Sequence, residues 1–208
     1  ANVPWVFRAV PADTEQISAL LDLAQKRGYH HLVVLTEVQR EAHTGFLRLK
    51  EIFARRHYPL DLNLEFSTLN PAEVLPQLEN ISIDALVVLG GTEPALNMIR
   101  ALRRAGIRAP ILGPSTLAMP EVINGAPLFL GDLTVASPCD LTRSDESIQE
   151  FSRRFQKRIG EQPSLVALYS YDVARLLIDA VAKAGLNRPR IVANRQPPIL
   201  RQLENACG

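Results

Sequence analysis

The chain has 208 residues, of which 47% are apolar and 22% are charged, a composition typical of one globular domain or slightly more. Its formal net charge of +1 gives no sign of a surface for nucleic acid or anionic membranes. No apolar stretch reaches the roughly 18–20 residues that a spanning helix needs. Residues 1–8 also lack the basic and apolar regions of a signal peptide.

Short β-rich runs alternate with longer helical patterns from the start of the chain. Their apolar and β-branched content predicts strands at residues 31–37, 60–66, 83–91, 109–114 and 126–135. Helical patterns lie between them, at residues 13–27, 40–56, 70–80 and 92–106. Asn70 and Thr92 are predicted as N-caps, and Gly28 and Gly106 as helix stops.

This alternation predicts an α/β fold with a doubly wound parallel sheet, helices on both faces and right-handed crossovers. The predicted α/β lobe spans residues 11–136. A polar, turn-rich stretch at residues 137–148 is the best internal boundary. Only helices are predicted after it, at residues 145–160 and 169–185.

These two later helices carry apolar stripes without an obvious partner. The second stripe consists of Val173, Leu176, Leu177, Ala180, Val181 and Ala184. Phe151 and Phe155 form a similar stripe on the helix before it. Amphipathic helices need a surface to cover, and the five predicted strands already have their own helices. The two helices therefore predict a further packing surface.

Four stretches in this order resemble the type I periplasmic binding proteins over residues 2–185. They are closest to the branched-chain amino acid and amide-type receptors of ABC transporters. The stretches are "VPWVFRAVPADTEQ", "HHLVVLTE", "DALVVLGGTEPALNMIRALRRAGIRAPILGPS" and "FSRRFQKRIGEQPSLVALYSYDVARLLIDAVAKAG". The order and spacing of the stretches, more than any single motif, carry the resemblance.

The resemblance implies two Rossmann-like lobes with a ligand cleft between them. Residues 11–136 would form the second lobe. Residues 1–10 and 137–208 would form crossover segments and helices of an incomplete first lobe, whose sheet precedes residue 1 in the family. The implied function is that of a solute-binding receptor for a small polar ligand, an amino acid or a related compound. The implied partner is the membrane permease of an ABC transporter, and the implied location is periplasmic or extracellular.

Candidate ligand residues come from the loops after the strands, because ligands of open parallel sheets bind beyond the carboxyl ends of the strands. The candidates are Glu37, Thr44, Gly91, Thr92, Glu93, Ser115 and Thr116.

The "GGTEP" loop is the clearest of these sites. Its glycines allow close approach of backbone to a ligand, and the amides of Thr92 and Glu93 at a helix N-terminus can bind an anion. A tight turn followed by a capped helix would explain the same residues.

Two positions depart from the family pattern. His43-Thr44-Gly45 replaces a Tyr-Gly pair, and Ser115 stands where amino-acid-binding relatives often place an acid. Both departures weigh against an amino acid as ligand.

Signatures of enzymes and cofactor sites are lacking, so we expect neither catalytic activity nor a cofactor. The sequence has no G-x-G-x-x-G after a strand, no P-loop lysine, no G-x-S-x-G, no H-E-x-x-H and no C-x-x-C. His30 and His31 would point to opposite faces of a strand and cannot share one metal. Cys139 and Cys207 could pair or could both be thiols.

An alternative function keeps the fold and drops transport. The chain could be a sensory or protein-interaction domain that forms a homodimer through the helices of residues 145–185. Oligomeric state distinguishes the two readings, because a large exposed apolar patch favours a protein interface.

Overall fold

The computed structural model describes residues 13–56, 58–60, 62–125, 131–139, 141 and 145–184. The chain divides into two compact units. The α/β unit is Ala12–Ser137, and the helical unit comprises Ala1–Pro11 and Pro138–Gly208.

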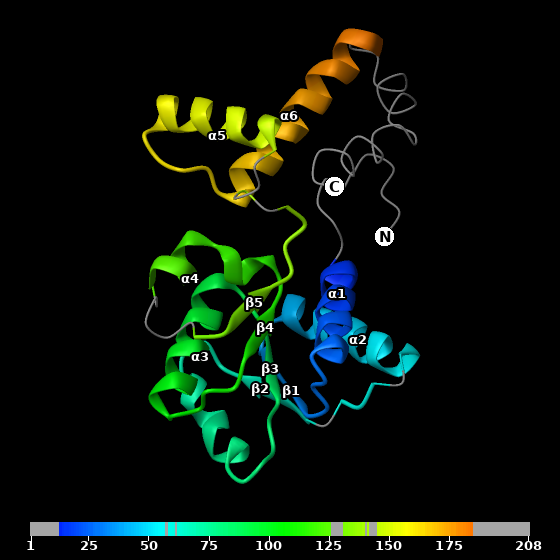
Figure 1. The fold of residues 1–208 in the computed structure, drawn as a ribbon, viewed down its shortest axis with the longest axis vertical. Coiled ribbons are helices and arrows are strands. Elements are labelled where there is room, and N and C mark those ends of the chain that lie inside the picture. The colour runs from blue at the N-terminus through cyan, green and yellow to red at the C-terminus, as the bar shows by residue number, and fades with distance from the viewer. Residues whose placement is uncertain are drawn as a thin grey trace. The chain divides into compact units, whose positions relative to one another are not determined.

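The α/β unit is built on one parallel sheet (Figure 1), and its strand order is β2-β1-β3-β4-β5. The strands are β1 (Leu32–Glu37), β2 (Leu62–Phe66), β3 (Ala85–Leu89), β4 (Ile111–Gly113) and β5 (Leu133–Val135). All five lie within the predicted ranges. The predicted fold class, an α/β lobe with a doubly wound parallel sheet, is confirmed.

Helices cover both faces of this sheet (Figure 1). One face carries α1 (Asp13–Lys26) and α2 (Arg40–Arg55). The other carries η1 (Pro71–Leu78), α3 (Thr92–Arg104), η2 (Ser115–Ala118) and α4 (Pro120–Gly125).

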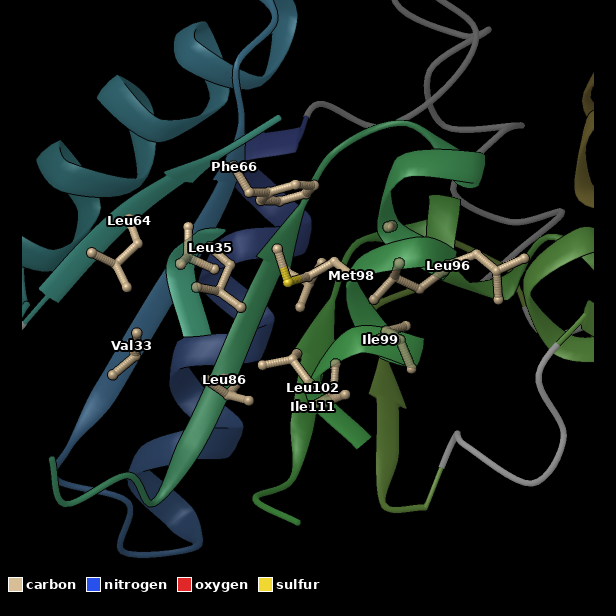
Figure 2. Packing of buried hydrophobic residues seen from close by; sticks show 14 of the residues in the cluster. Val33, Leu35, Leu64, Phe66, Leu86, Leu96, Met98, Ile99, Leu102 and Ile111 are labelled. Atoms are coloured by element: carbon tan, nitrogen blue, oxygen red, sulfur yellow. The ribbon is translucent and has the colours of Figure 1, made fainter. Parts of the chain in front are cut away.

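The period-two pattern of the strands divides the core into two layers. Val33 and Leu35 of β1 face α3 and η1, while Leu32 and Val34 face α1 and α2. Every residue of β1 is buried, as expected of a central strand between two helical layers. Figure 2 shows the α3 layer, in which Met98, Leu102 and other α3 side chains lie against strand residues.

The helix predicted at residues 70–80 is the 3-10 helix η1, and Asn70 is its N-cap as predicted. Two other predicted details are wrong. The N-cap of α3 is Gly91, and Thr92 is its first helical residue. The last helix begins at Leu165, because the Ser164 hydroxyl accepts the amide of Ala167 at 3.2 Å and starts the helix earlier.

The described part of the helical unit consists of α5 (Glu146–Ile159) and α6 (Leu165–Ala184). Asp145 caps α5 by accepting the Ser147 amide at 2.9 Å, and Gly160 ends it with a φ of 89°. The Phe151 ring lies 4.9 Å from Tyr171 between centroids, so an aromatic contact joins the two helices.

Candidate functional site

The strand order places a topological switch point between β1 and β3. The chain leaves β1 for β2 on one side of the sheet and then returns to β3 on the other side. At such a point the connections diverge and leave a crevice at the carboxyl ends of the strands, where ligands of open α/β sheets bind. Six of the seven candidate residues lie at or just after the carboxyl ends of β1, β3 and β4.

Glu37 is the last residue of β1 and is only 5% exposed. One carboxylate oxygen accepts the backbone N–H of Gly91 at 2.8 Å. The other accepts the hydroxyl of Thr68 at 2.8 Å. The side chain therefore connects the ends of β1, β2 and β3, and the structure brings Glu37 into direct contact with the glycine loop.

The N-terminus of α3 supplies backbone donors at this edge. Gly91 is the N-cap, with extended backbone, and its carbonyl accepts the first helical hydrogen bond from Ala95 at 3.0 Å. The amides of Thr92 and Glu93 belong to the first turn and have no acceptor within the helix. Pro94 follows them and has no N–H. Two first-turn amides can thus donate to an anionic or carbonyl group.

The loop after β4 carries the third group of candidates. The Ser115 amide donates to the side-chain oxygen of Gln16 in α1 at 2.8 Å, so this amide is used within the protein. The hydroxyl oxygen of Thr116 is buried and has no hydrogen-bond partner in the described part of the chain. A buried hydroxyl in this position is available to a partner such as water or a ligand.

One candidate cannot be placed. Thr44 belongs to α2, but its side chain lies outside the described residues, as does that of His43.

Two residues of the site were not predicted from the sequence. Thr68 sits in a polar turn after β2, and nothing in its spacing indicates that it reaches Glu37. Gln16 is 9% exposed and shares the buried side of α1 with Leu20. In the sequence, Gln16 could have been noticed only as a polar residue among the apolar residues of one helix face.

The described residues give little support for other kinds of site. They contain no group of three or more His, Cys, Asp or Glu that could hold a metal ion. None of the helices described is both long and apolar enough for a membrane span. Cys139 is buried, and Cys207 lies outside the described residues.

Solved structures with the same fold include several ABC transporter components. An extracellular ligand-binding receptor from Verminephrobacter eiseniae ef01-2 has a TM-score of 0.77 and 16% identity, covering 91% of this chain and 57% of its own. A putative branched-chain amino acid ABC transporter from Rhodospirillum rubrum has a TM-score of 0.74 and 23% identity, covering 98% and 57%. An ABC transporter solute-binding protein from R. palustris, in complex with benzoate, has a TM-score of 0.73 and 20% identity, covering 98% and 54%.

This chain therefore spans little more than half the length of those structures, and at these identities the likeness establishes the fold. The comparison with curated proteins gives no significant match. The sequence pattern of the periplasmic binding proteins, a family of binding proteins and not of enzymes, matches residues 1–196. Because this match covers most of the chain, the chain belongs to the periplasmic binding protein family.

Proposed function

We propose that this chain is part of a solute-binding receptor that presents a small polar ligand to the membrane permease of an ABC transporter. The ligand is a small compound with a carboxylate or carbonyl group, as in amino acids and related compounds, and the receptor works in the periplasm or outside the cell. Membership of the family supports this function. The observation that carries it is the gathering, at the switch point of the sheet, of polar groups and of first-turn amides that have no acceptor within their helix. Closure of a second lobe over this edge would bury the ligand.

Each proposed ligand residue has a role consistent with its contacts. Thr92 and Glu93 donate backbone amides to a carbonyl or carboxylate group of the ligand. Thr116 offers a buried hydroxyl, and Ser115 offers only its hydroxyl because its amide is bound to Gln16.

The test is a nuclear magnetic resonance titration with leucine and benzoate at millimolar concentration. We expect the amide signals of Glu93 and of the loop after β4 to shift. One edge of a cleft supplies only part of the contacts, so binding should be weak. Shifts confined to other surfaces, with none at these loops, would contradict the proposal.

A pair of variants at Thr92 isolates the backbone donor. Thr92→Pro removes the amide but suits the first helical position, and the extended Gly91 before it has a ψ of 166° that proline tolerates. Thr92→Val keeps the amide and removes the hydroxyl. We expect Thr92→Pro to weaken binding about tenfold, as loss of one hydrogen bond to a charged group would. If Thr92→Val were the more damaging change, the side chain and not the helix terminus would bind the ligand.

The alternative, an interaction domain that forms a homodimer, is supported by the surface of the helical unit. Large apolar side chains are exposed there, among them Ile178 at 66% and Leu177 at 43%. A groove of about 620 Å³ also lies on this unit, lined by Phe151, Arg154, Phe155, Lys157, Arg158, Ile159 and Tyr171. Aromatic walls with arginine beside them are typical of protein interfaces.

The charge pattern of α5 favours a second copy of the chain as the occupant of that groove. The N-terminal half of the helix is acidic, and its C-terminal half is basic. Two copies of α5 packed antiparallel about a twofold axis would therefore place opposite charges together at both ends. The residues are Asp145, Glu146 and Glu150 at the acidic end, and Arg153, Arg154, Lys157 and Arg158 at the basic end.

Light scattering after size exclusion decides between the two functions. Leu177→Glu places a charge on the exposed apolar surface of α6, and Leu69→Glu is the matched control because Leu69 is 95% exposed in the α/β unit. If the dimer exists, Leu177→Glu should yield a folded monomer while Leu69→Glu stays dimeric. If the parent chain is monomeric at 100 µM or more, the homodimer is excluded and the receptor function is the one that remains.

A further inference from the structure

We propose that Glu37 is a positioning residue of this edge, which holds the glycine loop in its binding shape and does not itself contact the ligand. The inference rests on the proposed receptor function for its biological meaning. Glu37, Gly91 and Thr68 all lie within the α/β unit.

The first support is the state of the carboxylate. Glu37 is buried, and each of its oxygens already accepts a hydrogen bond, one from Gly91 and one from Thr68. Hydrogen bonds to a charged acceptor are about twice as strong as neutral ones. A ligand would have to break at least one of these bonds or share a crowded oxygen, so the carboxylate is better suited to hold the loop than to recognise a solute.

The second support is steric. A Cβ placed on Gly90 would lie 3.1 Å from the Cβ of Glu37 and 3.1 Å from its carboxylate oxygen. Gly90 has no need of glycine for its backbone, since it is not among the described residues with positive φ. The close approach of Glu37 therefore explains why residue 90 is a glycine. The Glu37 side chain packs directly against the Gly90 backbone across the switch point.

The third support is electrostatic. The hydrogen bond to Gly91 places the negative charge of Glu37 at the N-cap of α3, where the helix carries partial positive charge. The protein thus supplies its own anion at the N-cap amide. Only the amides of Thr92 and Glu93 remain for a ligand at this terminus.

The first experiment measures hydrogen exchange and the chemical shift of the Gly91 amide in the full chain, without any ligand. We expect Glu37→Ala to shift the Gly91 proton signal upfield and to speed its exchange at least tenfold. Glu37→Gln should retain part of the protection, because its amide oxygen can accept from the Gly91 N–H while its amide NH2 group donates to the Thr68 hydroxyl oxygen. Glu121→Ala, which removes an exposed acid from the first turn of α4, is the control and should change neither quantity.

A chemical rescue separates the carboxylate from the bulk of the side chain. In Glu37→Ala, formate at 100–300 mM should restore Gly91 protection and raise the melting temperature by several degrees relative to equal sodium chloride. The parent and Glu121→Ala should respond to the two salts alike. A formate effect of the same size in all three proteins would overturn the proposal.

A double-mutant cycle tests the packing of Glu37 against Gly90 from the other side. Gly90→Ala should lower Gly91 protection in the parent, and should lower it less in the Glu37→Ala background, where the contact with the carboxylate oxygen is removed and the contact with the Cβ of residue 37 remains. Thr68→Val gives a milder variant should Glu37→Ala fail to fold, and should cost part of the same protection. Additive effects of Gly90→Ala and Glu37→Ala would contradict the proposal.

These results are independent of the receptor function. If Gly91 responds as expected and no solute binds, the positioning contact stands and the receptor function fails. If leucine or benzoate binds and Glu37→Gln abolishes that binding while leaving Gly91 exchange as in the parent, Glu37 is a ligand residue and the positioning role is wrong.

Discussion

The α/β unit and the helical unit bury their apolar residues to very different degrees. In the α/β unit, all residues of β1 and β3 are buried, and helices cover the sheet on both faces. In the helical unit, α6 is 20 residues long but leaves Val166, Leu177 and Ile178 exposed. The α/β unit buries the apolar residues of its sheet against those of its own helices. The helical unit presents an apolar surface that resembles one side of an interface, whether with another lobe or with a second chain.

The largest expected effect comes from matched leucine truncations in the two regions. Leu102→Ala removes a fully buried side chain between α3 and the sheet, and should lower the free energy of unfolding by about 2–5 kcal/mol. Leu177→Ala removes a side chain that is 43% exposed, and should cost less than about 1 kcal/mol. Denaturant titration of both variants measures the difference. Equal losses would mean that Leu177 is covered in solution, which would favour the dimer.

A smaller effect is expected from two helix-terminal glycines, one in each region. Gly106 after α3 and Gly160 after α5 have φ values of +83° and +89°, and a Cβ on either would meet no atom within 4 Å. Replacement by alanine therefore costs only backbone strain, about 1 kcal/mol in each case.

Hydrogen exchange shows where each cost falls. We expect Gly106→Ala to speed exchange in the α/β unit, and Gly160→Ala to speed it in α5 and α6. Asp145→Ala, which removes the N-cap of α5, should reproduce the Gly160→Ala pattern. If either glycine variant lowered protection evenly throughout both units, the separation into two compact units would not hold in solution.

Strands and helices could be predicted from the sequence where the local apolar pattern matches the burial of the same residues in the folded chain. The apolar run of β3 is typical of a strand with both faces buried, and the alternation in β2 indicates a strand with one wetter face, on which Glu65 is exposed. The short helices η2 and α4 were not predicted. Pro114 precedes η2 and Pro120 is the first residue of α4, and neither helix is long enough to show a helical period.

The candidate site was predictable to a lesser extent, because its key contacts join residues far apart in sequence. The position of Glu37 at a strand end pointed to the site, but its hydrogen bonds reach 31 and 54 residues along the chain. Only the register of β1 against β2 and β3 brings Thr68 and Gly91 to it. The same holds for the Gln16 contact with Ser115, which spans 99 residues.

The smallest expected effect lies at the opposite end of the same strands. Asp84, just before β3, accepts the backbone amides of His31 at 2.9 Å and His30 at 2.7 Å. These hydrogen bonds, that from His31 first, hold the pKa of Asp84 below its ordinary value of 3.8. Because the folded-state pKa is lower than the unfolded one, the charge of Asp84 stabilises the fold above the unfolded pKa, and this contribution is lost as pH falls through the folded pKa.

Asp84→Asn keeps an oxygen acceptor and removes the charge. Its free energy of unfolding should therefore be lower than that of the parent at neutral pH, and equal to it at low pH. Denaturant titrations should give a small, constant deficit relative to the parent above about pH 5, shrinking toward zero below about pH 4. The deficit should be modest because the site is open to solvent. Glu121→Gln, at an exposed acid in the first turn of α4, serves as the control for general charge effects. If both variants followed the same pH curve, net charge would account for the pH dependence, and the hydrogen bonds from His30 and His31 would not. Asp84 would then contribute less to its end of the sheet than we propose for Glu37 at the other end.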